Sequence, residues 1–180
     1  MQQQRRMGVF CALVLMAASA FAASGAVGPV TLAVPEGFVA AASQAQGKMQ
    51  VAAWTKGSGS TKTLLQVSIY DFGSSAEGEP SEKDLAAGAE KYLGEFLKGI
   101  ERRRTSYSQS PFEHLKLAGL PAARSTWKGL AGDTPAIGVM YCVIVNKRLV
   151  VSLHTQDAGS EITAAMREAM RAIESMRVAP

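Results

Sequence analysis

Two histidines and one cysteine of the predicted mature chain have the most versatile chemistry, and none of them falls in a pattern that defines a site. His114 lies next to Glu113, and His154 is followed by Asp157 at a spacing that a turn can fold back. A zinc site needs three or four converging ligands, and neither an H-x-x-x-H nor a C-x-x-C spacing is present. We therefore predict no metal site. The alternative is a weak surface zinc site, formed if the sheet places His114 beside His154 with Asp157 or Glu113.

Nucleophilic catalysis is not indicated either. No G-x-S-x-G sequence occurs, and the glycines of residues 57–60 are not followed by the Lys-Ser/Thr of a phosphate-binding loop. Cys142 lies in the apolar run of residues 140–144, with no charged residue or histidine in that segment to lower the pKa of its thiol. We predict that Cys142 is a buried core residue and that the protein has no catalytic and no cofactor-binding residues. The sequence thus favours a protein that is not an enzyme.

One cluster of basic residues is a candidate binding surface. It consists of Lys98, Arg102, Arg103 and Arg104, with Tyr107 as an aromatic neighbour. We predict either a patch for an anionic surface or partner, or a solvated helix end whose cations offset the negative end of the helix dipole.

The elements that hold these residues follow from hydrophobic periodicity. Ser81 and Asp84 resemble a capping box, and the apolar residues that follow recur on one face of a helix ending near Arg102. Ser160 is the expected N-cap of a second helix, whose apolar face carries Met166, Met170 and Met176. We expect these methionines to pack in the core, in preference to lining a soft-metal site or a groove.

Alternating or continuous apolar runs predict strands. They are residues 30–34, 50–55, 63–70, 112–118, 123–128, 137–145 and 149–155. The segments 50–55 and 63–70 are expected to form a hairpin around a Gly/Ser loop, and 137–145 pairs with 149–155 through a turn at Asn146. Strand 123–128 has one polar face, whereas the last two strands are apolar on both faces, as strands covered on both sides are. The predicted fold class is α+β: an antiparallel sheet of six to seven strands with two main helices packed on it.

The first residues have the pattern of a secretory signal. Arg5 and Arg6 precede an uncharged apolar run, and small residues follow with A-x-A spacing. We predict a signal peptide at residues 1–22, cleaved after Ala22 or alternatively after Ala20, a short linker at 23–29 and a single domain at 30–180. An uncleaved anchor and a twin-arginine signal are the alternatives. Cys11 is then lost with the signal, and no stable membrane insertion is expected after cleavage.

Charge limits the partners. The formal net charge of +4 falls to about +2 when Arg5 and Arg6 are removed, because no acidic residue leaves with them. This balance is too small to indicate nucleic-acid binding. With Cys142 as the remaining cysteine, no internal disulfide can form in the mature chain.

The order of segments resembles a known fold group. Residues 34–38 (Val-Pro-Glu-Gly-Phe), the Ala118-Gly119-Leu120-Pro121-Ala122-Ala123-Arg124 turn and the closing Ile173-Glu174-Ser175-Met176 are similar to features of PsbP-like proteins, and within them of bacterial DcrB-related exported domains. The resemblance covers nearly all of the predicted mature chain. It implies an antiparallel sheet with helices packed against it, in small exported proteins that act as accessory or binding modules. The group carries no shared catalytic set to transfer.

We therefore expect an exported, non-catalytic binding or accessory protein of the periplasm or cell envelope, with a protein partner there. Two alternatives stay open. One is a periplasmic immunity protein that neutralises an antibacterial effector, and the other is a weak metal-binding protein or hydrolase that uses His114 or His154.

Overall fold

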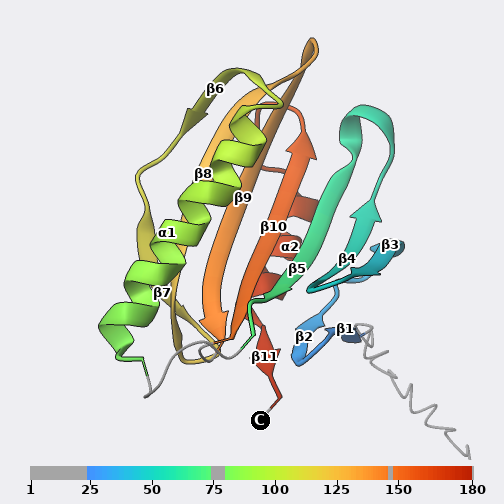
Figure 1. The fold of residues 1–180 in the computed structure, drawn as a ribbon. Coiled ribbons are helices and arrows are strands. Elements are labelled where there is room, and N and C mark those ends of the chain that lie inside the picture. The colour runs from blue at the N-terminus through green and yellow to red at the C-terminus, as the bar shows by residue number, and fades with distance from the viewer. Residues whose placement is uncertain (1–23, 74–79, 146–147, 180) are drawn as a thin grey trace, which may run out of the picture.

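The computed structural model describes residues 24–73, 80–145 and 148–179, which form one large sheet, one small sheet and two helices (Figure 1). The predicted signal peptide, both of its cleavage sites and the predicted turn at Asn146 lie outside these residues. In the described part of the chain, no helix is long and apolar enough to cross a membrane.

The large sheet is antiparallel throughout, with seven strands in the order β3-β4-β5-β10-β9-β8-β6 and β7 as an eighth strand paired with β8. Its strands are β3 (Val39–Gln46), β4 (Met49–Lys56), β5 (Thr63–Asp71), β6 (Thr105–Gln109), β7 (Glu113–Leu117), β8 (Leu120–Ala131), β9 (Thr134–Val145) and β10 (Leu149–Ala158). Strand β8 is long enough for β7 to pair with its first half and β6 with its second half. The predicted α+β class, an antiparallel sheet with two helices packed on it, is confirmed, as is the β4–β5 hairpin, whose loop holds a short turn of helix, η1 (Gly59–Thr61).

Helix α1 (Glu82–Glu101) begins and ends close to the predicted residues. The Ser81 side chain accepts a hydrogen bond from the Asp84 amide, and the Asp84 carboxylate accepts one from the Ser81 amide, so the capping box is complete. Ala89, Leu93 and Leu97 are buried on its sheet-facing side. The helical periodicity of the sequence therefore identified the packed face.

Helix α2 (Ala164–Glu174) starts later than predicted, because Thr163 and not Ser160 is its N-cap. The Thr163 hydroxyl accepts a hydrogen bond from the Met166 amide at 3.2 Å, and the Asp157 carboxylate accepts one from the Thr163 amide at 2.9 Å. A buried carboxylate at the end of β10 thus fixes where the helix begins. The expected core packing of the methionines is confirmed, because Met166 and Met176 are buried and the partly buried Met170 packs against the same core.

Four strands of the described residues were not predicted: β1 (Ser24–Val27), β3, β6 and β11 (Arg177–Val178). Strands β1 and β11 form a separate small sheet with β2 (Val30–Ala33), in the order β1-β2-β11. The expected linker at 23–29 therefore contains a strand, and the first predicted strand, β2, lies outside the large sheet. Gly25 of β1 packs so closely on Trp54 that a Cβ atom there would lie 2.5 Å from the indole, so contact with the hairpin orders this segment.

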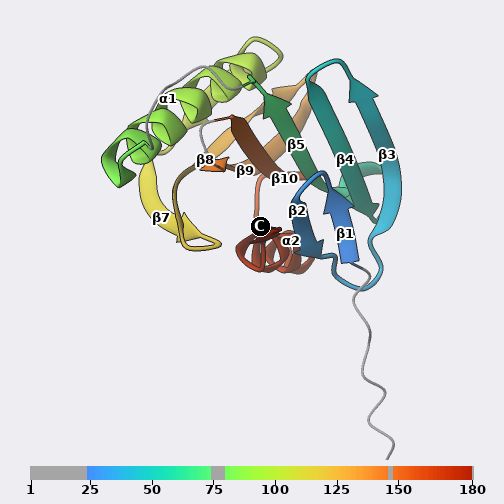
Figure 2. The ribbon, with the colours of Figure 1, turned by 60° about the horizontal axis from the view of Figure 1, so that its bottom comes forward.

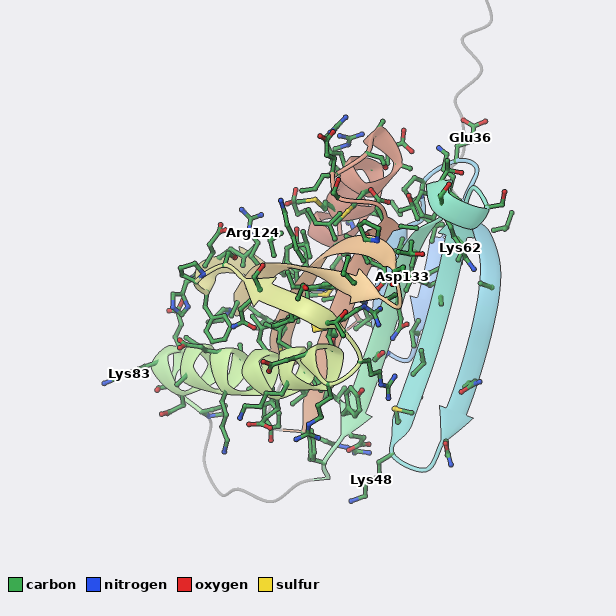
Figure 3. All side chains as sticks on the ribbon, turned by 90° about the horizontal axis from the view of Figure 1, so that it is seen from above. Glu36, Lys48, Lys62, Lys83, Arg124 and Asp133 are labelled. Atoms are coloured by element: carbon green, nitrogen blue, oxygen red, sulfur yellow. The ribbon has the colours of Figure 1, made fainter. Side chains whose placement is uncertain are left out.

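The two helices cover opposite faces of the large sheet (Figures 2 and 3). Helix α2 and the small sheet cover one hydrophobic core, which includes Val67, Tyr141 and Leu153. Helix α1 covers the other, which includes Trp127 and Cys142. Strands β9 and β10 contribute to both cores, as their continuous apolar sequences predicted, whereas Arg124, Thr126 and Lys128 give β8 its more polar face, on the side of α2.

The burial of Cys142 predicts slow chemistry at its thiol. Its side chain is fully buried between β9 and α1, and burial raises the pKa of the thiol to about 12. Since the thiolate is the reactive form, we expect a soluble maleimide to label native protein at a rate set by global unfolding. Intact mass spectrometry with and without urea measures this rate, and rapid labelling of the native protein would contradict the assigned packing.

Candidate functional site

A cleft opens beside the C-terminal half of α1, where the helix stops covering the sheet. A helix is about 10 Å wide and strands are about 4.8 Å apart, so one helix covers roughly two strands. Helix α1 lies mainly over β8 and β9, and β5 and β10 form the floor of a cleft of about 390 Å³ at its side. Its lining residues are Leu64, Gln66, Ser68 and Tyr70 of β5, Met140 of β9, Ser152, His154 and Gln156 of β10, Glu95, Phe96, Gly99 and Ile100 of α1, and Arg103 and Arg104 after the helix.

The floor of the cleft is polar because of strand register. Side chains alternate between the two faces of a strand, so Gln66 and Ser68 point to the α1 face while Val67 enters the opposite core. In the β5–β10 ladder, Gln66 is opposite His154 and Ser68 is opposite Ser152. Two adjacent strands thus place four polar side chains together on the floor of the cleft.

His154 is the most constrained of these groups. Its side chain is 8% exposed, and Trp127 Nε1 donates a hydrogen bond to its Nε2 atom at 3.2 Å. An indole N–H can only donate, so Nε2 is the acceptor and the proton of the neutral ring is on Nδ1. Burial, with a smaller effect from the charge of Arg104, lowers the pKa of His154 to about 4. At neutral pH the imidazole is therefore uncharged and a weak base.

Trp127 organises this end of the cleft. The Arg104 guanidinium lies 5.5 Å from the centre of the indole, a cation–π distance, and the indole covers Gly138 of β9. A Cβ atom at Gly138 would lie 2.4 Å from the indole ring, closer than any real contact. Only glycine at this position lets the indole lie flat enough on the sheet to reach His154.

We expect Gly138→Ala to lower the free energy of unfolding by about 2 kcal/mol, the usual cost of overpacking a core. Strand β9 is held between β8 and β10 and has little freedom to move away. Urea unfolding followed by circular dichroism measures the loss. In a Trp127→Ala background the same substitution should cost much less, and an unchanged cost would show that the indole is not the cause.

The predicted basic cluster is divided by the fold. Arg103 and Arg104 line the cleft, whereas Arg102 is an exposed C-cap residue outside its lining. Lys98 forms an ion pair with Glu95 at 2.9 Å, and the Tyr107 hydroxyl donates to Gln109 at 2.8 Å. Burial, and to a lesser degree the charge of Glu101, raises the pKa of Tyr107 to about 12. The structure therefore brings two of the five predicted patch residues to the cleft.

The second histidine lies elsewhere. His114 is exposed on β7, with its Nε2 3.5 Å from a carboxylate oxygen of Glu90. Strands β8 and β9 separate β7 from β10, which puts the two histidine-bearing strands roughly 14 Å apart. Glu113 pairs with Arg124, and Asp157 accepts from Thr63, so neither carboxylate joins the histidines. Among the described residues, no group of three His, Cys, Asp or Glu side chains is placed to hold a metal ion.

A broader hollow of about 510 Å³ surrounds His114 at the N-terminal end of α1. In this hollow Lys116 forms an ion pair with Glu82, and His114 lies near Glu90. All of these side chains are about half exposed or more. The cleft at the other end of α1 differs in having buried polar groups, which makes it the stronger candidate site.

Neither a protein-family model nor a curated protein sequence matches this chain. The fold resembles that of LpqN. The crystal structure of LpqN, a protein involved in cell envelope biogenesis of Mycobacterium tuberculosis, matches with a TM-score of 0.57 over 84% of this chain and 83% of that chain. The two sequences are 12% identical, so the similarity concerns the fold, and LpqN transfers no residue role to the cleft.

Proposed function

We propose that the protein is an exported, non-catalytic binding or accessory protein of the periplasm or cell envelope, and that the cleft beside α1 is its ligand site. The cleft carries this proposal. Its volume of about 390 Å³ falls in the usual range of about 300–1,000 Å³ for small-molecule sites, and it joins an apolar wall to a few buried polar groups.

The state of His154 supports binding over catalysis. A general base works best with a pKa near the operating pH, and the pKa of His154 is far below neutrality. Its Nε2 atom is also occupied by Trp127, so it does not activate Ser68 or Ser152 through that nitrogen. The side chains of the cleft are thus better suited to holding a ligand than to transferring a proton.

Two observations support the envelope location. The first 22 residues have the sequence pattern of a secretory signal, and LpqN, which has a similar fold, is involved in cell envelope biogenesis. We propose that its protein partner is also a component of the cell envelope.

Expression of the full chain in a bacterial host tests the proposal. We expect tagged protein to appear in the periplasm, with an intact mass that corresponds to a chain beginning near Ala23. Native mass spectrometry should then detect a retained small molecule or a cross-linked envelope protein. Retention in the cytoplasm would contradict export. Turnover of ester or phosphate substrates that is lost on His154→Gln would contradict the non-catalytic assignment.

A further inference from the structure

We propose that the cleft selects a small organic anion, with a carboxylate or phosphate headgroup joined to an apolar group. This inference rests on the proposed function, because it takes the cleft as the ligand site. It adds the chemical class of the ligand, which follows from the charges, donors and apolar surfaces of the lining.

The permanent charge of the lining favours an anion. Arg103 and Arg104 line the cleft, and each carries a positively charged guanidinium group. Glu95 is the one acidic residue among the lining side chains, and its carboxylate is already paired with Lys98 at 2.9 Å. The cations that face the cleft are therefore not cancelled by its own acid.

Arg104 also has a donor in need of an acceptor. Its terminal nitrogen Nη1 donates to the Arg103 carbonyl at 3.0 Å, while its Nε atom is buried and has no hydrogen-bond partner in the described structure. Buried polar groups without partners are rare and costly in folded proteins. Because this atom is covered by protein, an oxyanion would reach it only after the Arg104 side chain turns toward the cleft, whereas the positive charge of the guanidinium acts on the cleft without direct contact.

The floor adds donors without adding negative charge. The neutral His154 ring has its proton on Nδ1, since Nε2 accepts from Trp127. The hydroxyl groups of Ser68 and Ser152 are buried within the same lining and can donate to a ligand oxygen. With the two arginines, these groups can stabilise an oxyanion by hydrogen bonds as well as by charge.

The apolar part of the lining, shared by the sheet and α1, calls for an organic group. Tyr70 and Phe96 stack with ring centres 5.2 Å apart, and Leu64, Ile100 and Met140 extend this apolar surface. Inorganic phosphate or sulfate would leave that surface in contact with water. An anion that carries an aliphatic or aromatic group would cover it and gain hydrophobic free energy.

Two fluorescent probes that differ by one charge test the proposal on the purified mature protein. Anilinonaphthalene sulfonate is an organic anion, and phenylnaphthylamine is a similar aromatic amine without the sulfonate. We expect the anion to bind with one-to-one stoichiometry and at least about tenfold more tightly than the neutral probe, the effect of one charged hydrogen bond. Octanoate and octyl phosphate should displace the anionic probe, whereas inorganic phosphate should not. The relative affinities of octanoate and octyl phosphate compare the two headgroups.

Matched variants locate the binding. Arg103→Gln should weaken binding of the anionic probe by about tenfold and leave binding of the neutral probe unchanged. Arg102→Gln removes a neighbouring charge outside the lining, and this variant should bind both probes like the wild type. Gly99 lines the cleft, and a Cβ atom added there meets nothing within 4 Å. Gly99→Trp should fill the cleft and abolish binding, whereas Gly99→Ala should preserve it, with both variants folded by circular dichroism.

The outcomes separate two kinds of failure. If both probes bind equally well and Gly99→Trp blocks both, the inferred ligand class is wrong while the cleft remains a binding site. Binding of the anion that survives Gly99→Trp, or no binding of either probe, overturns the inference. The proposed function fails separately if the protein from the periplasm also retains neither a small molecule nor an envelope partner.

Discussion

Replacing Trp127 by alanine should lower the free energy of unfolding by about 3–5 kcal/mol, the range observed when large aromatic side chains are removed from a core. Trp127 is fully buried between α1 and the sheet, so its removal leaves a large cavity. The substitution also removes the donor to His154 Nε2 and the aromatic surface beneath Arg104. Urea unfolding followed by far-ultraviolet circular dichroism measures the loss.

Trp127→Phe separates packing from hydrogen bonding. Phenylalanine keeps an aromatic ring over Gly138 and near Arg104 but has no N–H group to donate to His154. We expect the Trp127→Phe protein to be more stable than the Trp127→Ala protein and less stable than the wild type, because a buried acceptor loses its partner. A Trp127→Ala variant as stable as the wild type would mean that the indole does not occupy the core position described here.

Long apolar segments and helix caps could be predicted from the sequence because their signals are local. The capping box of Ser81 and Asp84 defined the start of α1, and the runs around Val143 and Val151 defined two strands buried on both faces. Local signals failed where a tertiary contact decides the structure. Strand β3 (VAAASQAQ) lacks an alternating pattern of large apolar residues and is ordered as an edge strand by pairing with β4.

The candidate site could not be predicted because it forms across strands that are distant in sequence. Trp127 and His154 are 27 residues apart on β8 and β10, and β9 lies between those strands. Gln66 joins them only because β5 pairs with β10 in that particular register. The strongest local hint was the basic cluster, which identified Arg103 and Arg104 without indicating that they face polar groups on the sheet.

The similarity to LpqN concerns the fold and does not extend to the cleft. Two chains with 12% identity keep a common fold because a sheet and its helices tolerate many apolar sequences of similar volume. A binding site depends on individual side chains and on their geometry, so it changes much more readily than the fold. The proposed ligand class is therefore inferred from His154, Arg103 and Arg104, and not from LpqN.

His154 should make the protein sensitive to mild acid. Burial, and secondarily Arg104, lowers its pKa from the usual 6.5 to about 4 in the folded protein. Between these values the unfolded chain binds a proton at this residue that the folded chain does not bind, so the free energy of unfolding falls as pH falls. We expect a loss of about 3 kcal/mol from pH 7 to pH 4, with full stability above pH 6.5 and no further loss from this residue below pH 4.

His154→Gln isolates this effect, because glutamine keeps a polar side chain that can accept from Trp127 but does not titrate. Urea unfolding at pH 7 and pH 4 should show a much smaller difference for this variant than for the wild type. His114→Gln is the matched control, since it removes the exposed imidazole of β7 and should keep the acid sensitivity of the wild type. Equal pH dependence in the wild type and His154→Gln would show that the imidazole is protonated as readily in the folded protein as in the unfolded chain. That result would contradict the burial of the imidazole and its acceptor role toward Trp127.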